Sequence, residues 1–500
     1  MKTVPALTVT QWLREWEKVK FSAKDHRRKP EPNFYIFKMV APWLKSLSGI
    51  QRRTTESGQL RSADLGIQRR HDEQRSAEIR QFIHYGYPWS ELSPKKRGSG
   101  EFDDLRKPGW LPTSIVVNIL EAQDVRRGLR VAPKDLVKVS TAEASTATIT
   151  LPERFADASW RPESLPPIEV IDGQHRLWAF EGDGFEKEFE LPVVAFHGLD
   201  ISWQAYLFWT INIKPKKINA SLAFDLYPLL RTEDWLDKFE GHSIYRETRA
   251  QELTEGLWAI RESPWYQRIN MLGESGLETP MVSQAAWVRS LMATFVKRWE
   301  GPKIGGLFGA RLREHDEVLP WSRAQQAALL IYLGQCVKEA IKSTKADWAK
   351  ELRKGFPAGD DPAFYGANSL LMTDQGIRGL LHIVNDLCYV RADELKLVEW
   401  KSDVEAGASD EQAVRRSLSS LSDQRFSKFV DNIAVTLATY DWRTSSAPGL
   451  EESERIRKAA FRGSGGYKEL RRDLLKHVVD DGKVIGKAAE EVFIALGYNK

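Results

Sequence analysis

Five consecutive residues carry the most recognisable chemistry in this chain. Asp172, Gly173, Gln174, His175 and Arg176 place a carboxylate, an amide, an imidazole and a guanidinium next to one another. Arginine and histidine donate hydrogen bonds to phosphate oxygens, and an aspartate can hold Mg²⁺ together with such oxygens. We therefore expect a phosphate-binding corner, with Asp172 as a metal ligand or, alternatively, as a helix cap.

The surrounding sequence predicts a strand, a sharp turn and the start of a helix. The apolar run 168–171 is rich in β-branched residues, and the pair 172–173 is a turn signal. Good helix formers then continue until the glycines at 182 and 184. The first backbone N–H groups of such a helix favour an anion, so this turn would face the ligand.

Each residue of the motif has an expected role if the ligand is a triphosphate. The N–H groups of Gly173 and Gln174 would meet phosphate oxygens, Arg176 would neutralise them, and His175 would donate a hydrogen bond. The amide of Gln174 would orient an attacking water, and Asp172 would hold Mg²⁺. These expectations make Asp172, Gln174, His175 and Arg176 the candidate catalytic residues.

The motif resembles the signature of the DGQHR-domain family, which includes the DndB proteins of DNA phosphorothioate systems and the DpdB proteins of DNA 7-deazaguanine systems. More distantly it is similar to the ParB and sulfiredoxin superfamily, whose members hold nucleotide phosphates at the corresponding turn. The family's Phe-x-x-Ile-Asn segment matches Phe208 to Asn212. Sulfiredoxins have a cysteine where this chain has Gln174, so their redox chemistry is not expected here.

The resemblance also implies which residues bind the nucleotide. The family has a Gln-Arg pair ahead of its first helix, which we assign to Gln68 and Arg69, with Gln51 and Arg52 as the competing assignment. The expected nucleotide-binding set is then Gln68, Arg69, Gly173, Gln174, His175, Arg176 and Asn212. The implied cofactors are ATP, or another NTP, and Mg²⁺.

Two functions follow from the resemblance. In the first, the chain is a nucleotide-binding protein, an ATPase, working with a DNA-modifying partner enzyme in bacterial DNA modification or phage defence. In the second, it is a non-enzymatic DNA-binding regulator of a DNA-modification operon. Either way DNA is an expected partner, and a homo-oligomer is left open.

The distribution of charge favours a polyanionic partner. The whole chain carries a net charge of +4, but residues 1–100 contain 20 Lys and Arg against 10 Asp and Glu, a local +10. A basic region of this kind is typical of nucleic-acid contact, although a solvated surface of mixed charge is the alternative. The candidate DNA-contacting residues are Arg52, Arg53, Arg70, Lys214, Lys216 and Lys217.

Composition excludes several classes of protein. Apolar content of 42% and charged content of 28% are those of a globular protein, and no apolar run approaches the roughly 20 residues that span a bilayer. No secretory signal is visible and only two cysteines occur, so we expect a reduced, cytoplasmic protein. The sequence shows no Cys/His spacing that resembles a zinc site and no Gly-x-Ser-x-Gly elbow. It also has no P-loop, the glycine-rich stretch 461–468 included.

The fold expected is α/β, with a ParB/sulfiredoxin-like mixed-sheet core and a large, mainly helical C-terminal region. Strands are predicted within 33–47, 112–120, 146–151, 167–172 and 189–196, and helices at about 72–86 and 203–211. Asn118 interrupts an apolar strand, and we expect it to satisfy neighbouring backbone. The domains expected are an N-terminal helix with a basic connector (1–32), the core (33–230), a helical domain (231–400) and a helical C-terminal region with a glycine-rich turn (401–500).

Overall fold

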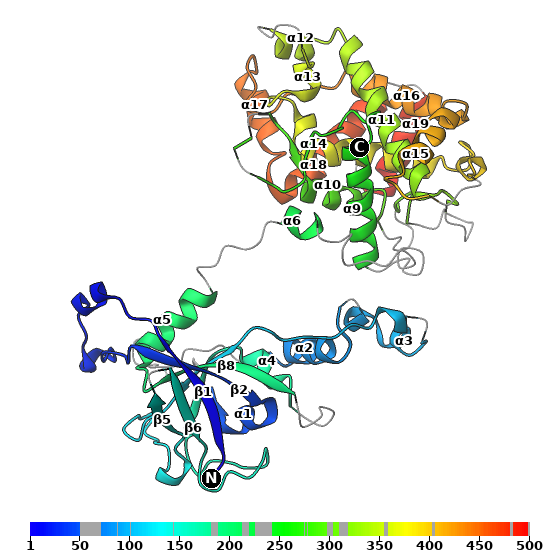
Figure 1. The fold of residues 1–500 in the computed structure, drawn as a ribbon. Coiled ribbons are helices and arrows are strands. Elements are labelled where there is room, and N and C mark those ends of the chain that lie inside the picture. The colour runs from blue at the N-terminus through cyan, green and yellow to red at the C-terminus, as the bar shows by residue number, and fades with distance from the viewer. Residues whose placement is uncertain are drawn as a thin grey trace. The chain divides into compact units, whose positions relative to one another are not determined.

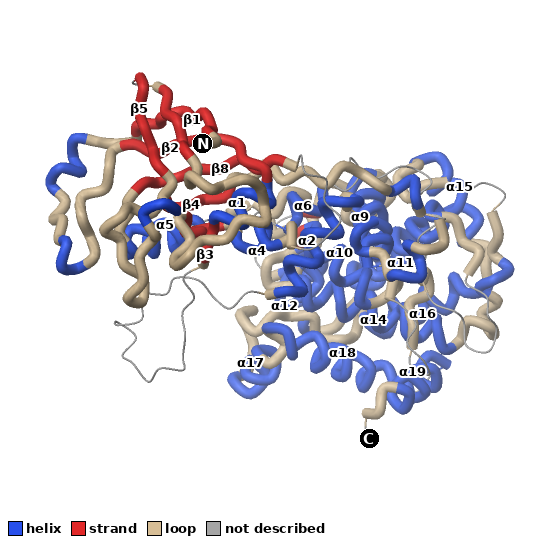
Figure 2. The backbone as a smooth tube through the Cα atoms, turned by 90° about the horizontal axis from the view of Figure 1, so that it is seen from below, coloured by secondary structure: helices blue, strands red, loops and turns tan. Residues whose placement is uncertain are grey.

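The structure is a computed structural model. It divides into two compact units, Met1–Lys216 and Lys217–Lys500. The strands gather mainly in the first unit, whereas helices dominate the second (Figure 2). The α/β class with a helical C-terminal region is therefore confirmed. The residues that the structure describes are 1–50, 72–87, 89–100, 102–143, 145–181, 189–212, 220–225, 243–274, 276–277, 279–297, 304–309, 319–354, 359–402, 406–480 and 484–498.

A mixed, eight-stranded sheet forms the centre of the first unit (Figure 1). Its order is β3-β7-β4-β8-β2-β1-β6-β5. Strands β3 and β7, and likewise β4 and β8, run parallel, while the other neighbours are antiparallel. The strands are β1 (Thr3–Thr10), β2 (Asn33–Val40), β3 (Ser48–Gly49), β4 (Ile115–Ile119), β5 (Lys138–Glu143), β6 (Thr146–Thr150), β7 (Ile168–Asp172) and β8 (Glu190–His197).

Helices α1 and α4 cover one face of the central strands. Leu44 and Leu47 of α1, and Leu177 of α4, share a buried apolar cluster with Ile168 and Val170 of β7. Since side chains alternate along a strand, Glu169 points to the other face, where α5 packs against β7. The helices of this unit are α1 (Ala41–Leu47), α2 (Glu73–Tyr85), α3 (Pro94–Arg97), α4 (Gln174–Trp178) and α5 (Ile201–Asn212).

Most predicted elements of this unit are confirmed, with corrected bounds. Strands β2, β4, β6, β7 and β8 and helices α2 and α5 occur where the pattern of apolar residues indicates them. Asn118 is fully buried, and its Oδ1 accepts from Leu199 N at 2.9 Å. Its expected structural role is therefore confirmed.

The predicted motif helix was too long, because α4 ends at Trp178. The chain turns there and buries Phe180 against Phe189, with the two ring centroids 5.0 Å apart.

The expectation of an N-terminal helical segment apart from the core was wrong. Residues 3–10 form β1, which lies between β2 and β6 in the sheet. Leu7 pairs with both Ile36 and Thr146, so the backbone of this segment is satisfied by sheet neighbours on two sides. The aromatic stretch that follows contains only a short 3₁₀ turn, Arg14–Lys18. The boundary expected at residue 32 therefore does not separate two folded parts.

The second unit has one apolar core that continues across residue 400. Helix α11 packs against α15 and α16, and α14 packs against α18 and α19. Residues 231–400 and 401–500 are thus not separate bodies. The elements are α6 (Ala220–Asp225), α9 (Ser243–Ala259), β9 (Ile269–Asn270), β10 (Val282–Ser283), α10 (Gln284–Ala293), α11 (Arg323–Ser343), α12 (Asp347–Arg353), α13 (Pro362–Tyr365), α14 (Asp374–Val390), α15 (Glu411–Leu421), α16 (Arg425–Leu437), α17 (Glu452–Ala459), α18 (Gly463–Asp480) and α19 (Val484–Ala495).

The glycine-rich stretch that was expected to form a turn is itself helical, because α18 begins at Gly463. A side chain at Gly466 would meet the Phe461 carbonyl oxygen at 1.9 Å. This close approach explains the glycine without a ligand.

Among the described residues, no helix is both long enough and apolar enough to cross a membrane.

A buried ion pair fixes β7 to its surroundings on the α5 side. Arg126 donates to both carboxylate oxygens of Glu169, at 2.6 and 2.8 Å, and Gln204 of α5 donates to the same carboxylate at 3.0 Å. The side chains of Arg126 and Glu169 are 10% and 4% exposed. Removing one partner would leave the other charge buried without compensation.

We therefore expect Arg126→Ala to lower the free energy of unfolding of the first unit by about 3–5 kcal/mol. Urea unfolding of the full chain, with amide hydrogen exchange in β4 and β7 as the local readout, measures this. Arg130→Ala is the matched control, because Arg130 is an exposed arginine four residues away and should change stability by no more than about 0.5 kcal/mol. Equal effects of the two substitutions would contradict the role given to the ion pair.

Candidate active site

The motif forms a strand end, a left-handed turn and one short helix. Strand β7 ends at Asp172, Gly173 adopts φ +95°, and α4 follows. A side chain at Gly173 would meet Ile115 Cδ1 at 2.7 Å and Arg176 Nη2 at 3.2 Å. Both the positive φ and the close contacts therefore require glycine. With only five residues, α4 contributes little dipole of its own, so the chemistry of the corner depends on side chains.

The Arg176 guanidinium is held by protein groups. Nη2 donates to Asp172 Oδ2 at 2.7 Å, and Nη1 donates to Thr113 O and Oγ1, at 2.7 and 2.6 Å, and to Ser114 O at 3.0 Å. The side chains of Arg176 and Asp172 are only 20% and 18% exposed. Arg176 thus joins β7 to the segment that enters β4, and these bonds engage Nη1 and one of the two Nη2 donors.

Asp172 does not cap the motif helix. The N-cap residue of α4 is Gly173, and no side chain caps that end. Asp172 Oδ1 instead accepts from Asn212 Nδ2, 3.2 Å away, while Oδ2 binds Arg176. A carboxylate oxygen carries two lone pairs, so Oδ1 keeps one that Asn212 does not use among the described residues. That lone pair fits Mg²⁺ or a water bound to Mg²⁺.

Helix α2 is tied to the motif helix by three polar links. His175 Nε2 lies 3.4 Å from Asp72 N, which makes it the acceptor, and Ser76 Oγ donates to His175 O at 3.2 Å. Arg80 Nε donates to Ala179 O at 2.8 Å. An imidazole that accepts at Nε2 is neutral, with its proton on Nδ1, so His175 in this arrangement positions α2.

A cavity of about 1660 Å³ opens over the motif, α2 and the end of α5. Six residues of the predicted site are described in the structure, and all of them line the cavity: Asp172, Gly173, Gln174, His175, Arg176 and Asn212. The structure thus brings these residues together as expected. Its lining includes Asp72, Arg75, Glu78, Phe82, Tyr87, Glu91, Arg97, Asp172, Gly173, Gln174, His175, Arg176, Phe208 and Asn212.

Gln174 lines this cavity and contains a buried acceptor without a partner. The residue is 7% exposed, and its Oε1 has no hydrogen-bond partner in the described part of the chain. A buried oxygen without a donor costs roughly 1–3 kcal/mol, so a partner from outside the chain would stabilise it. Such a partner must be a donor: a water, a hydroxyl or an amino group.

Several predicted residues cannot be placed. Gln68 and Arg69, their alternatives Gln51 and Arg52, and the DNA candidates Arg53, Arg70, Lys214, Lys216 and Lys217 all lie outside the described residues. Conversely, sequence reasoning missed Arg75 and Glu78, which face the cavity from α2. Their spacing of three residues on a helix that follows the basic stretch was the available signal.

Comparisons with known proteins add no assignment. No protein-family model matches the chain, and no match was found among curated proteins or solved structures. The resemblance in the motif therefore stays a prediction, and the site is argued from its geometry.

Gly173→Ala tests whether the packing of Ile115 and Arg176 against the turn requires glycine. Gly128→Ala is the matched control: Gly128 also has a positive φ, +79°, but a side chain there meets nothing within 4 Å. Both substitutions carry the strain of a left-handed alanine, roughly 1–2 kcal/mol, and only Gly173→Ala adds close contacts, with Ile115 Cδ1 and with Arg176 Nη2. We expect the larger loss of thermal stability for Gly173→Ala, and equal losses would contradict this reading.

Proposed function

We propose that the first unit binds a nucleoside triphosphate, ATP or another NTP, in the cavity over the motif and hydrolyses it. The observation that carries this proposal is the buried, unsatisfied Oε1 of Gln174 beneath a cavity lined by arginines and aromatic rings. Phosphate oxygens only accept hydrogen bonds, so they cannot satisfy Oε1. A water held beside the phosphates could satisfy it once the Gln174 side chain turns Oε1 toward the cavity. An oriented water is what phosphoryl hydrolysis requires.

Arg75 is the best candidate for direct contact with phosphate. It is exposed, it lines the cavity, and its guanidinium has no partner among the described residues. A guanidinium binds phosphate through two parallel hydrogen bonds. Arg75 can do this with its whole guanidinium, whereas Nη1 and one Nη2 donor of Arg176 are already engaged by protein acceptors.

The charges that line the cavity explain the expected need for Mg²⁺. Four carboxylates (Asp72, Glu78, Glu91 and Asp172) face three guanidiniums (Arg75, Arg97 and Arg176). This lining does not offset the charge of a triphosphate by itself, so a divalent cation would have to enter with the nucleotide. Asp172 Oδ1 is the oxygen that fits this cation.

The aromatic side chains in the lining suit the base of a nucleotide. Phe82, Tyr87 and Phe208 reach the cavity from α2, the turn after it and α5. Aromatic rings stack on the π-face of any base, so they give affinity without selecting one base. The resemblance to DGQHR-domain proteins supports placing this activity beside a DNA-modifying partner enzyme in bacterial DNA modification or phage defence.

Phosphate release from ATP in the presence of Mg²⁺ tests the proposal. Gln174→Leu removes the acceptor at similar size, and we expect hydrolysis to fall by about 10²-fold or more while nucleotide affinity changes little. Arg75→Ala should instead weaken nucleotide binding by about tenfold or more. Calorimetry with a non-hydrolysable ATP analogue separates the two effects.

Arg130→Ala is the control for Arg75→Ala, because Arg130 is exposed and does not line the cavity. It should bind and hydrolyse like the wild type. A wild-type chain that neither binds nor hydrolyses any NTP would refute the proposal. So would a Gln174→Leu variant with unchanged turnover.

The local charge of +10 on residues 1–100 favours a second candidate function, that of a non-enzymatic DNA-binding regulator. Within the described residues, α3 adds exposed positive charge through Lys95 and the partly exposed Lys96. A protein that binds the phosphate backbone releases counterions, so its affinity falls steeply with salt.

We expect the affinity for duplex DNA to fall linearly on a logarithmic salt scale. The double variant Lys95→Ala/Lys96→Ala should weaken binding at all sequences and reduce the salt slope by about 2. The matched double variant Lys342→Ala/Lys345→Ala changes two exposed lysines of the second unit and should keep the wild-type slope. Affinity that is independent of salt would rule out backbone binding.

A further inference from the structure

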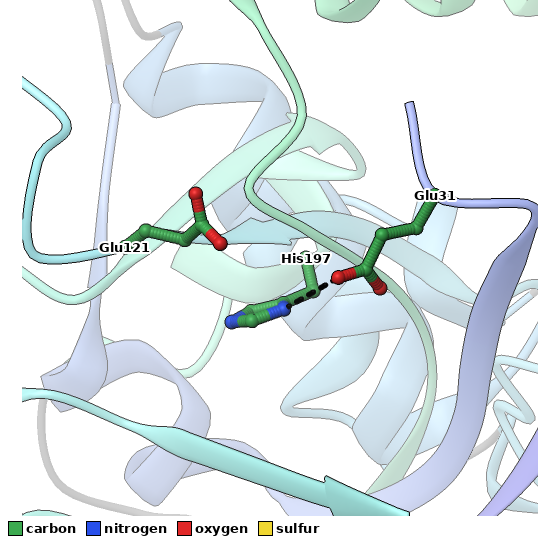
Figure 3. Close-up of side chains that lie close together, drawn as sticks. All are labelled: Glu31, Glu121 and His197. Carbon is green, nitrogen blue, oxygen red and sulfur yellow. Dashed lines mark hydrogen bonds and ion pairs between the residues drawn. The ribbon is translucent and has the colours of Figure 1, made fainter. Parts of the chain in front are cut away.

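Three potential metal ligands meet at the first unit, away from the cavity. Glu31, Glu121 and His197 lie close together, with His197 between the two carboxylates (Figure 3). One ligand atom from each residue lies within 4.8 Å of the others. His197 Nδ1 and Glu31 Oε1 are 3.4 Å apart. The three residues come from segments that are far apart in the sequence.

The sheet brings two of these residues together. Strands β4 and β8 run parallel, with Ile119 opposite His197, so Glu121 lies just past the same end of the sheet. Gly198 has φ +60°, and a side chain there would approach Glu121 Cδ to 2.6 Å. Glycine at this position therefore leaves the room that the Glu121 carboxylate occupies.

Arg28 holds the third ligand in place. Its Nε donates to Asp200 Oδ1 and its Nη2 to Asp124 Oδ1, both at 2.9 Å. The backbone carbonyl of Arg28 accepts from Trp203 Nε1 at 2.8 Å. These contacts fix the segment before β2 against the sheet, and Glu31 follows three residues later.

The local charge favours a further cation. The Arg28 guanidinium pairs with the carboxylates of Glu121, Asp124 and Asp200, and Glu31 adds a fourth carboxylate beside His197. These four carboxylates and Arg28 together carry a formal charge of −3, before any charge on His197.

We propose that Glu31, Glu121 and His197 form a binding site for a divalent transition-metal ion, with Zn²⁺ as the probe. One imidazole and two carboxylates are a ligand set that zinc accepts, with water in the fourth position. Ligand atoms about 2.1 Å from a tetrahedral ion lie about 3.4 Å apart. The side chain of Glu31 is 45% exposed and that of Glu121 is 28% exposed. Both therefore have space to move from the present separation of up to 4.8 Å to the separation that a tetrahedral ion requires.

The bound ion would tie the segment before β2 to the ends of β4 and β8. This role is structural and does not depend on the proposed nucleotide function. A metal site made of N and O ligands also differs in chemistry from the expected Mg²⁺ position, which has oxygen ligands only.

Calorimetric titration of the chelator-treated full chain with Zn²⁺ tests the site, and Co²⁺ absorption reports its geometry. We expect one Zn²⁺ per chain, and affinity about tenfold or more lower in His197→Ala and in Glu121→Gln. The near-isosteric Glu121→Gln decides the question if His197→Ala does not fold. His84→Ala is the control, because His84 is an exposed histidine of α2 outside the cluster.

The proposal is overturned if the wild-type chain takes up no Zn²⁺, or if both ligand variants bind it as the wild type does. It is equally overturned if His84→Ala abolishes binding and the ligand variants do not. Zn²⁺ uptake is measured without nucleotide, so failure here is distinguishable from failure of the nucleotide proposal.

Discussion

The Arg176 guanidinium is the contact on which the candidate site depends. It connects the end of β7, through Asp172, with the segment that enters β4, through Thr113 and Ser114. The turn at Gly173 has to be tight because this guanidinium lies against it. A ligand would therefore meet a corner whose shape is already fixed, and such preorganisation is what electrostatic catalysis requires. The same rigidity limits Arg176 as a direct phosphate ligand.

Strand β7 separates two different environments. On one face Ile168 and Val170 pack into the apolar core under α1 and α4, and on the other Glu169 is buried among polar partners. Helix α5 is fixed to this strand near its start by Gln204 and at its last residue by Asn212. The position of α5 relative to β7 is therefore fixed at both ends of the helix, and α5 contributes Phe208 to the lining of the cavity.

Sequence patterns predicted what depends on local order. The structure confirms the strand predicted from the β-branched run, the turn predicted from the Asp-Gly pair and the central strands predicted from their apolar residues. Sequence patterns failed where a segment becomes a strand through its sheet neighbours. Residues 3–10 contain Pro5 and precede an aromatic stretch, and they form β1 by pairing with β2 and β6. Thr113 and Ser114, which accept from Arg176, lie about 60 residues earlier, and Glu31, which contacts His197, is more distant still. Contacts of that range carry no local signal.

The two sites of the first unit lie at opposite ends of one strand. Asp172 is opposite Val116 at the start of β4, whereas His197 is opposite Ile119 at its end. Three steps of about 3.3 Å separate Val116 from Ile119, which puts about 10 Å of strand between the two pairing positions. Groups in water that far apart interact weakly at physiological ionic strength, where the screening length is about 8 Å. Occupation of the proposed metal site should thus leave the charge balance of the cavity nearly unchanged.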